Sequence, residues 1–169
     1  MKLVRPSMEF KDQVMEYRNE FLTNGENLAG SSYLSRYEAY GEWLQFVWDN
    51  EQEDTKHTGV TADEFLAIRE EDNKLIGLIN IRHSLTDYLF NFGGHIGYSV
   101  RREERRKGYG KEMLRQALEK CRKLNLKEVL ITCDASNIAS AKTILSCGGV
   151  LDNEVMEGEE TIQRYWIHL

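Results

Sequence analysis

The spacing of apolar residues along this chain predicts alternating strands and helices. Apolar side chains that alternate with polar ones are typical of strands, and apolar side chains three and four residues apart are typical of one helix face. The alternation predicts strands over residues 2–5, 63–70, 74–84, 94–100, 128–133, 150–156 and 161–168. The longer spacing predicts helices over residues 7–24, 35–48, 110–124 and 137–148.

Local signals mark where the first helices begin and end. Ser7 can cap the first helix, and Gly25 ends it. Ser35-Arg-Tyr-Glu38 has the form of a capping box and is expected to open the second helix. The polar stretches 49–61 and 85–93 are predicted to be loops.

The order of these elements predicts an α/β (α+β) fold. We expect a mixed, mostly antiparallel central sheet of six to seven strands with helices on both faces. The strands at 94–100 and 128–133 are separated by a helix, which predicts a parallel pair with a right-handed connection. The chain has 169 residues and no repeat, linker or low-complexity tract, so residues 1–169 are predicted to form a single domain.

Composition excludes several classes of protein. No apolar run approaches the ~20 residues of a membrane span, and the N-terminus lacks an apolar signal core. The net charge of −6 argues against general nucleic-acid binding. The four histidines show no metal-ligand spacing, so no metal site is expected. Three cysteines in apolar patterns indicate reduced thiols, which predicts a cytoplasmic location.

The most informative stretch joins the strand at 94–100 to the helix at 110–124. Residues 101–107 carry four Arg and one Lys against two Glu, a local charge of +3. Gly108 and Gly110 permit unusual backbone dihedrals and a close approach of a ligand. Free amides at a helix N-terminus bind anions, and phosphate is the usual one. The alternative is a solvated charge run beside a turn; the spacing fits neither a dinucleotide fingerprint nor a P-loop.

Arg105-x-x-Gly108-x-Gly110, between a strand and a helix, resembles the acetyl-CoA pyrophosphate loop of the GNAT acyltransferases. The clear match covers roughly residues 75–150. The resemblance implies the GNAT fold and acetyl-CoA as co-substrate. Carried onto this chain, it implies a cofactor site made of Ser99, Val100, Arg105, Arg106, Lys107, Gly108, Tyr109, Gly110, Lys111, Asn137 and Ser140. Asn137 and Ser140 could instead simply cap a helix.

The resemblance also implies catalytic residues. His95-Ile-Gly-Tyr98 is similar to the strand of the branch that acetylates ribosomal-protein N-termini, where a Glu often stands at the position of His95. His95 is therefore a candidate general base, although it could equally be a histidine buried within a sheet. Many members carry a general-acid Tyr where this chain has Ile144. Tyr98, Tyr165 or water would then have to replace it.

The acceptor is the least defined part of the prediction. The family reaction implies an amine, on a small molecule or a peptide. In that family the loop between the first two helices borders the acceptor, so Tyr33 and Tyr37 are candidate contacts, with a core role the alternative. Family members often pair, which implies a homodimer. A catalytically idle acyl-CoA-binding or sensor domain, and a protein-interaction module using the Arg cluster, remain alternative functions.

Overall fold

The computed structural model describes residues 1–54 and 57–169. Their order of elements follows the prediction. The strands are β1 (Lys2–Val4), β2 (Ala62–Arg69), β3 (Lys74–Arg82), β4 (Ile96–Val100), β5 (Glu128–Asp134), β6 (Val150–Glu157) and β7 (Glu160–His168). The α-helices are α1 (Lys11–Thr23), α2 (Tyr40–Asn50), α3 (Tyr109–Lys123) and α4 (Ile138–Ser146). Short 3-10 helices lie at Met8–Phe10, Leu34–Arg36 and Arg102–Glu104, and a π-helix lies at Leu89–Gly93.

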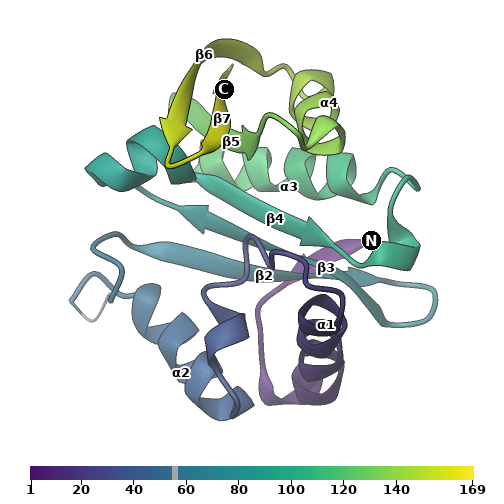
Figure 1. Ribbon diagram of the computed structural model, residues 1–169. Coiled ribbons are helices and arrows are strands. Elements are labelled where there is room, and N and C mark those ends of the chain that lie inside the picture. Colours follow the sequence, from purple (N-terminus) through teal and green to yellow (C-terminus); the bar gives the residue numbers. More distant parts are fainter. Residues whose placement is uncertain (55–56) are drawn as a thin grey trace.

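The predicted fold class is confirmed, with the strands divided between two sheets. One sheet has the order β1-β2-β3-β4 and the other the order β5-β7-β6. Every ladder between described strands is antiparallel. Helices α1 and α2 cover one face of the first sheet, and α3 lies on its other face (Figure 1). The four-stranded sheet is therefore covered on both faces.

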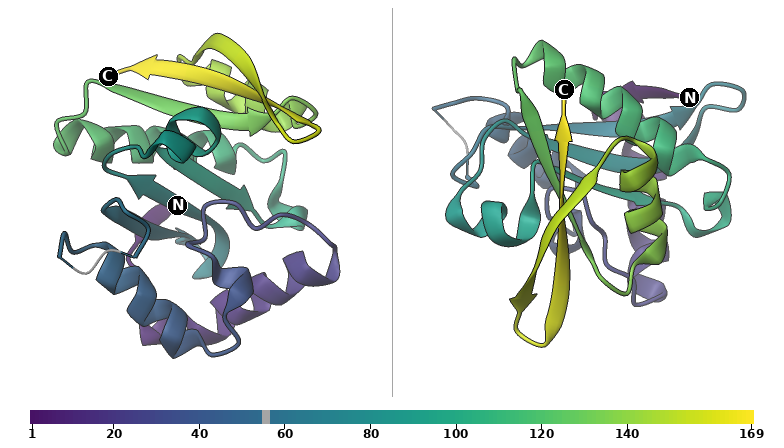
Figure 2. Two further views of the ribbon diagram at one scale, coloured as in Figure 1. Left: turned by 60° about the vertical axis from the view of Figure 1, so that its left-hand side comes forward. Right: turned by 90° about the horizontal axis from the view of Figure 1, so that it is seen from above.

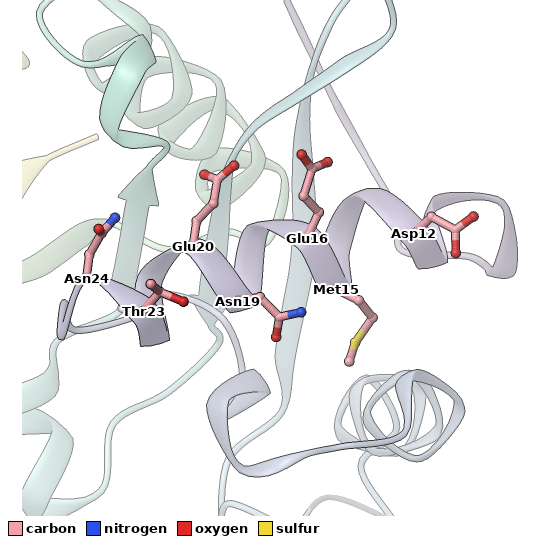
Figure 3. Close-up of a pocket in the computed structure, with 7 residues that line it drawn as sticks. All are labelled: Asp12, Met15, Glu16, Asn19, Glu20, Thr23 and Asn24. Carbon is pink, nitrogen blue, oxygen red and sulfur yellow. The ribbon is translucent and has the colours of Figure 1, made fainter.

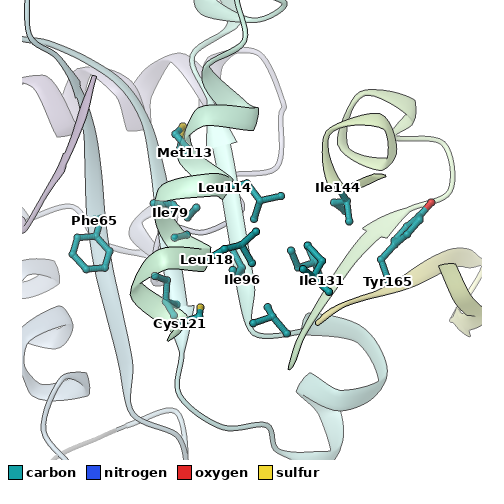
Figure 4. Close-up of a cluster of buried hydrophobic side chains, with 14 of the residues drawn as sticks. Phe65, Ile79, Ile96, Met113, Leu114, Leu118, Cys121, Ile131, Ile144 and Tyr165 are labelled. Atoms are coloured by element: carbon teal, nitrogen blue, oxygen red, sulfur yellow. The ribbon is translucent and has the colours of Figure 1, made fainter. Parts of the chain in front are cut away.

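Each face of the first sheet contributes to its own hydrophobic core. On one face, α1 and α2 bury aromatic and aliphatic side chains against the sheet. On the other face, α3 packs between the two sheets (Figure 4). The helix stripe predicted from sequence forms part of this second core: Met113, Leu114, Ala117, Leu118 and Cys121 are buried.

Strands β4 and β5 diverge, and this divergence defines the place where a site can form. They were expected to pair, but they belong to different sheets (Figure 2). They meet at His95, whose amide donates to the Leu130 carbonyl at 2.7 Å. Beyond this contact β4 pairs on that side with no other strand of the described chain, and the Tyr98 hydroxyl lies 3.1 Å from the Ser140 hydroxyl of α4.

The predicted capping box at Ser35–Glu38 is wrong. Leu34 is fully buried, and the preceding Tyr33 has a left-handed φ of 60°. Anchoring Leu34 in the core winds the segment into the 3-10 helix Leu34–Arg36. The second helix then begins only at Tyr40. A buried contact has therefore overridden a local capping signal.

Two further expectations need correction. Ser7 does not cap a helix with its side chain; its carbonyl accepts a hydrogen bond from the Tyr40 hydroxyl at 2.7 Å. The predicted loop 85–93 contains the π-helix. Arg82, Arg164 and Thr132 donate side-chain hydrogen bonds to carbonyls of that π-helix, which stabilises a conformation that sequence periodicity does not signal.

Candidate active site

A cavity of about 1110 Å³ opens beside the divergent edge of β4. Residues 98–100 of β4 line it, and the turn before α3 and the first turn of α4 form its walls. Of the predicted cofactor residues, it brings together Ser99, Val100, Arg105, Arg106, Gly108, Gly110, Lys111, Asn137 and Ser140. The side chains of Lys107 and Tyr109 lie outside it, engaged by Glu104 and Arg69 respectively.

The turn before α3 leaves a series of backbone amides free. Arg105 N donates to Arg102 O at 3.3 Å, and Glu112 N donates to Gly108 O at 3.1 Å. Between them, no amide from Arg106 to Lys111 donates to an acceptor in the described part of the chain. The first-turn amides of a helix carry partial positive charge and suit a phosphate.

Gly108 explains why the turn can take this shape. Its φ is 88°, in the left-handed region that favours glycine, and it is the N-cap residue of α3. A Cβ built there would meet no atom within 4 Å, so it would project into open space at the cavity. The position therefore needs glycine for its backbone and leaves room for a ligand.

Much of the basic charge in this stretch is already neutralised inside the protein. Arg105 forms an ion pair with Glu26, and Lys107 pairs with Glu104 at 2.9 Å. Arg105 also donates from Nε to the Val100 carbonyl at 3.0 Å, which fixes the turn against β4. Within the described residues, three cations lining the cavity have no ion-pair partner: Arg106, Lys111 and Lys142. Their charge is available to an anion.

The strand β4 contributes further donors. The amide of Arg101 donates to the Ile76 carbonyl at 2.8 Å, so Arg101 and, two residues earlier, Ser99 face β3. Because antiparallel pairing alternates along a strand, the amides of Tyr98 and Val100 point the other way, toward the cavity. The amide of Val100, unlike that of Ser99, is therefore directed toward the cavity.

The N-terminus of α4 closes the opposite wall. The side-chain oxygen of Asn137 accepts from the amide of Ser140 at 3.1 Å, so Asn137 does cap the helix. The Ser140 hydroxyl lies 3.1 Å from the Tyr98 hydroxyl. Burial raises the pKa of Tyr98 to about 12, so the phenol keeps its proton at neutral pH and can donate a hydrogen bond.

The position where the family that this chain resembles often carries a general-acid Tyr is occupied by a core residue. Ile144 is fully buried beneath α4. Tyr165, the other phenol considered, is buried and donates to Gln163 at 2.7 Å, away from the cavity lining. Tyr98 is thus the one tyrosine that lines the cavity among the described residues.

His95 is held outside the cavity. Its Nδ1 accepts a hydrogen bond from the Leu130 amide at 2.9 Å, and its ring lies near Trp166. Burial, with a smaller effect of nearby Arg82, lowers the pKa of His95 to about 4. The ring holds the residue before β4 against β5, and this position argues against a role as general base.

The two tyrosines expected near an acceptor lie outside the cavity lining. Tyr37 is half-buried and packs on Phe46 and the α1–α2 core. Tyr33 is 48% exposed, with the Arg36 guanidinium 4.6 Å from its ring centroid. Tyr33 is therefore the more accessible of the two.

Sequence reasoning missed a buried carboxyl group beneath the loop that joins α1 to α2. Glu64 lies in the middle of β2, is 1% exposed, and contacts Ser32 and Asn80. The available signal was a charged residue inside an apolar strand pattern. Its partners are distant in sequence, so the cluster itself could not be identified.

A second, shallower hollow of about 650 Å³ runs along α1 (Figure 3). Asp12, Glu16 and Glu20 line it, and Glu20 is bound by Arg101 at 2.6 Å. It contains none of the residues predicted to bind a cofactor. In the described residues we find neither a cluster of three potential metal ligands nor a helix long and apolar enough to cross a membrane.

Comparison with known proteins agrees with this geometry. A point mutant of the spermidine N-acetyltransferase SpeG from Vibrio cholerae superposes with a TM-score of 0.69 at 16% identity, over 99% of this chain and 95% of that one. The microcin C7 self-immunity acetyltransferase MccE, solved with acetyl-CoA and AMP, gives a TM-score of 0.72 at 16% identity, over 99% and 91%.

A putative ribosomal-protein-serine acetyltransferase from Vibrio cholerae gives a TM-score of 0.64 at 20% identity, over 99% and 92% of the two chains. Comparison with curated protein sequences finds no match. Residues 11–150 match the family described as Acetyltransferase (GNAT) domain. The chain belongs to this family of acetyl-CoA-dependent N-acetyltransferases, and its reaction is transfer of an acetyl group from acetyl-CoA to an amine.

Proposed function

We propose that the cavity beside β4 binds acetyl-CoA, with its diphosphate at the amides of residues 106–111. The observation that carries the proposal is the coincidence of free amides at the N-terminus of α3 with cations around the cavity that have no ion-pair partner in the described residues. Arg106, Lys111 and Lys142 supply the charge, and Gly108 and Gly110 supply the space. Backbone amides and basic side chains together form a site for a strongly charged diphosphate.

The backbone of β4 would then direct the acyl arm. Val100 and Tyr98 direct their amides into the divergence of the two sheets, where an extended amide-bearing arm can add hydrogen bonds. An amide donor at the thioester oxygen stabilises the negative charge that develops there during acyl transfer. We assign this role to the amide of Val100 or Tyr98. The side-chain nitrogen of Asn137 is a further donor to the arm.

Tyr98 is proposed to act on the leaving group. Its hydroxyl lies beside Ser140 in the cavity, and its pKa of about 12 is above the ~8.5 of a thiol. The phenol therefore stabilises a thiolate by donating a hydrogen bond rather than by giving up its proton. His95 remains a weaker candidate for the base, since its Nδ1 is occupied and its pKa is about 4.

We propose that the acceptor amine approaches from the side of the α1–α2 loop that carries Tyr33. A small-molecule and a peptide amine both fit this proposal. The three cysteines are free thiols, which supports a reducing, cytoplasmic compartment. Pairing into a homodimer is supported by the edge strand β6, which exposes Val150, Leu151 and Met156.

A thermal-shift assay with acetyl-CoA tests the proposal. Acetyl-CoA at 100 times its dissociation constant is expected to stabilise the protein by about 2.7 kcal/mol. Release of free thiol over a panel of amines then separates an active enzyme from a catalytically idle acyl-CoA-binding domain. Absence of any stabilisation would contradict the proposed cofactor site, and stabilisation without thiol release would favour the idle domain.

A further inference from the structure

A buried polar cluster lies beneath the loop that joins α1 to α2. Ser32 donates to Oε2 of Glu64 at 2.6 Å, and Asn80 donates to the same oxygen at 3.2 Å. Asn80 also donates to the Ser32 hydroxyl at 3.1 Å. The other carboxyl oxygen, Oε1, is buried and has no hydrogen-bond partner. A buried carboxyl oxygen without a partner is costly, so the cluster requires an explanation beyond packing.

The cluster adjoins the part of β4 that lines the cavity. In the sheet, Asn80 lies directly opposite Glu64 on one side and opposite Gly97 on the other. Gly30 of the overlying loop contacts the peptide between Gly97 and Tyr98 so closely that a Cβ on it would lie 2.1 Å from the Gly97 carbonyl oxygen. The Glu64 cluster is therefore one strand away from the backbone assigned to the thioester.

Ser32 lies between the buried carboxyl group of Glu64 and the protein surface. Glu64 and Asn80 are buried, whereas Ser32 is only partly buried. Its φ of 47° is unusual for a residue other than glycine, and the hydrogen bond to Glu64 holds it in that conformation. Among Ser32, Glu64 and Asn80, Ser32 is thus the one residue that is not fully buried.

The electrostatic surroundings suit reversible protonation. Burial raises the pKa of Glu64 to about 8, against the lowering effect of the Ser32 and Asn80 hydrogen bonds. Arg82 of β3 also lowers this pKa, and Glu51, which follows α2, raises it. A base whose pKa lies near the working pH is effective in proton transfer, whereas His95 is far from that range.

We propose that Ser32 and Glu64 form a proton relay that accepts the proton released by the acceptor amine during acetyl transfer. The inference rests on the proposed function of the neighbouring cavity. It assigns the role of base to residues that the sequence motif did not include. Asn80 positions the relay by donating to both Ser32 and Glu64.

Protons and charge balance within this relay. The amine lone pair forms the new C–N bond, and collapse of the adduct breaks the C–S bond, so that CoA leaves as a thiolate. The adduct N–H passes its proton to the Ser32 oxygen while the Ser32 hydroxyl proton moves to ionised Glu64. After product release, neutral Glu64 returns its proton to solvent through Ser32.

The test compares Glu64→Gln with the unchanged protein, using the best amine from the acceptor panel. Gln keeps the shape and an oxygen for Ser32 and Asn80 but cannot take a proton. We expect kcat to fall roughly 100-fold at high pH, with the KM for acetyl-CoA unchanged. The kcat/KM of the unchanged protein divided by that of Glu64→Gln should rise with pH and level off above about 8, where Glu64 is ionised. The titration of the amine affects both proteins equally and therefore cancels in this ratio.

Two further variants complete the experiment. Asp63→Asn is the matched control, since Asp63 lies beside Glu64 on β2 but pairs with Arg5 at 2.8 Å and with His83 at 3.0 Å. It should leave the pH profile unchanged. Ser32→Gly removes the hydroxyl while suiting the left-handed backbone, and it should lower kcat as Glu64→Gln does.

A ratio that does not vary with pH, or a kcat of Glu64→Gln within twofold of the unchanged protein, would overturn the relay. Both variants should retain the thermal shift with acetyl-CoA, which shows that they fold. If the unchanged protein itself neither binds acetyl-CoA nor releases thiol, the proposed function fails instead. The two failures are therefore distinguishable.

Discussion

The two sides of β4 are built in different ways. On the proposed cofactor side, most of the donors come from one continuous stretch, residues 98–111, and Asn137 and Lys142 are added from the region of α4. On the proposed acceptor side, Ser32, Glu64 and Asn80 come from a loop and two strands and meet only in the folded chain. A site that binds a common cofactor can thus be local, whereas the neighbouring site depends on tertiary structure.

The two sides of β4 also differ in whether their charged groups are exposed or buried. The cofactor side presents free backbone amides and exposed cations, which an anion can satisfy. The acceptor side buries an acid group with an unpartnered oxygen. A group held in this way destabilises the fold, and such groups are typical of functional sites. The following experiments test this contrast, from the largest expected effect to the smallest.

Replacing Gly108 should have the largest effect, and only on the cofactor side. Gly108→Val places a side chain into the open space at the diphosphate site and strains a φ of 88°. We expect the ~2.7 kcal/mol stabilisation by saturating acetyl-CoA to be lost in a thermal-shift assay. Gly148→Val is the matched control, because Gly148 has a φ of 92° and equally open space but does not line the cavity.

Retention of the cofactor shift by Gly108→Val would show that the turn is not the diphosphate site. Loss of the shift in Gly148→Val as well would attribute the effect to backbone strain instead.

Replacing His95 should weaken the contact between β4 and β5 and so lower the stability of the fold. His95→Ala leaves the buried amide of Leu130 without its acceptor, and we expect a loss of about 2–3 kcal/mol in the free energy of unfolding. The measurement is urea unfolding with and without acetyl-CoA. A large loss of kcat with unchanged stability would contradict this structural role and indicate that His95 is the general base.

Replacing Glu64 should stabilise the protein. The pKa of this acid is higher in the folded chain than the 4.5 of the free group, so the unfolded state releases its proton first as pH rises. The stability of the unchanged protein therefore falls between pH 4.5 and about 8 and then levels off. Glu64→Gln removes this loss, so we expect the variant to be more stable than the unchanged protein at pH 8 and equally stable at pH 4.5.

Urea unfolding at the two pH values measures this difference. An equal effect of Glu64→Gln at both pH values would show that Glu64 does not change its charge between the folded and unfolded chain in that range.

Replacing Tyr98 should have the smallest effect. Tyr98→Phe keeps the ring but removes the hydroxyl beside Ser140, and we expect kcat to fall by a few-fold, about 1 kcal/mol in the barrier. Steady-state kinetics should show little change in the KM for acetyl-CoA. A fall of kcat beyond roughly 100-fold would mean that the phenol transfers its proton to the leaving thiolate.

The sequence was sufficient for the parts of the fold that depend on local signals. The stripe of α3, the glycine-bearing turn and the final hairpin all lie where periodicity and turn residues predict them. Local signals were misleading where tertiary contacts decide the conformation. Burial of Leu34 replaces the predicted capping box with a 3-10 helix. Side-chain hydrogen bonds stabilise the π-helix at Leu89–Gly93.

The same division holds for the site. Gly108 and Asn137 could be found from spacing, because each is the N-cap residue directly before a helix. The occupied ring of His95 and the cluster around Glu64 could not, because their partners lie on segments distant in the sequence. The sequence shows that position 95 is a histidine and position 64 a glutamate, but it does not show which residues bind them by hydrogen bonds.

The central claim is that the free amides before α3 hold the diphosphate of acetyl-CoA. Titration of the ¹⁵N-labelled protein with acetyl-CoA, followed by amide chemical shifts, tests it most directly. We predict that the amides of Gly108, Tyr109, Gly110 and Lys111 shift strongly and saturate together, while those near Gly148 stay in place. Binding that leaves the amides of residues 108–111 unmoved would contradict the account.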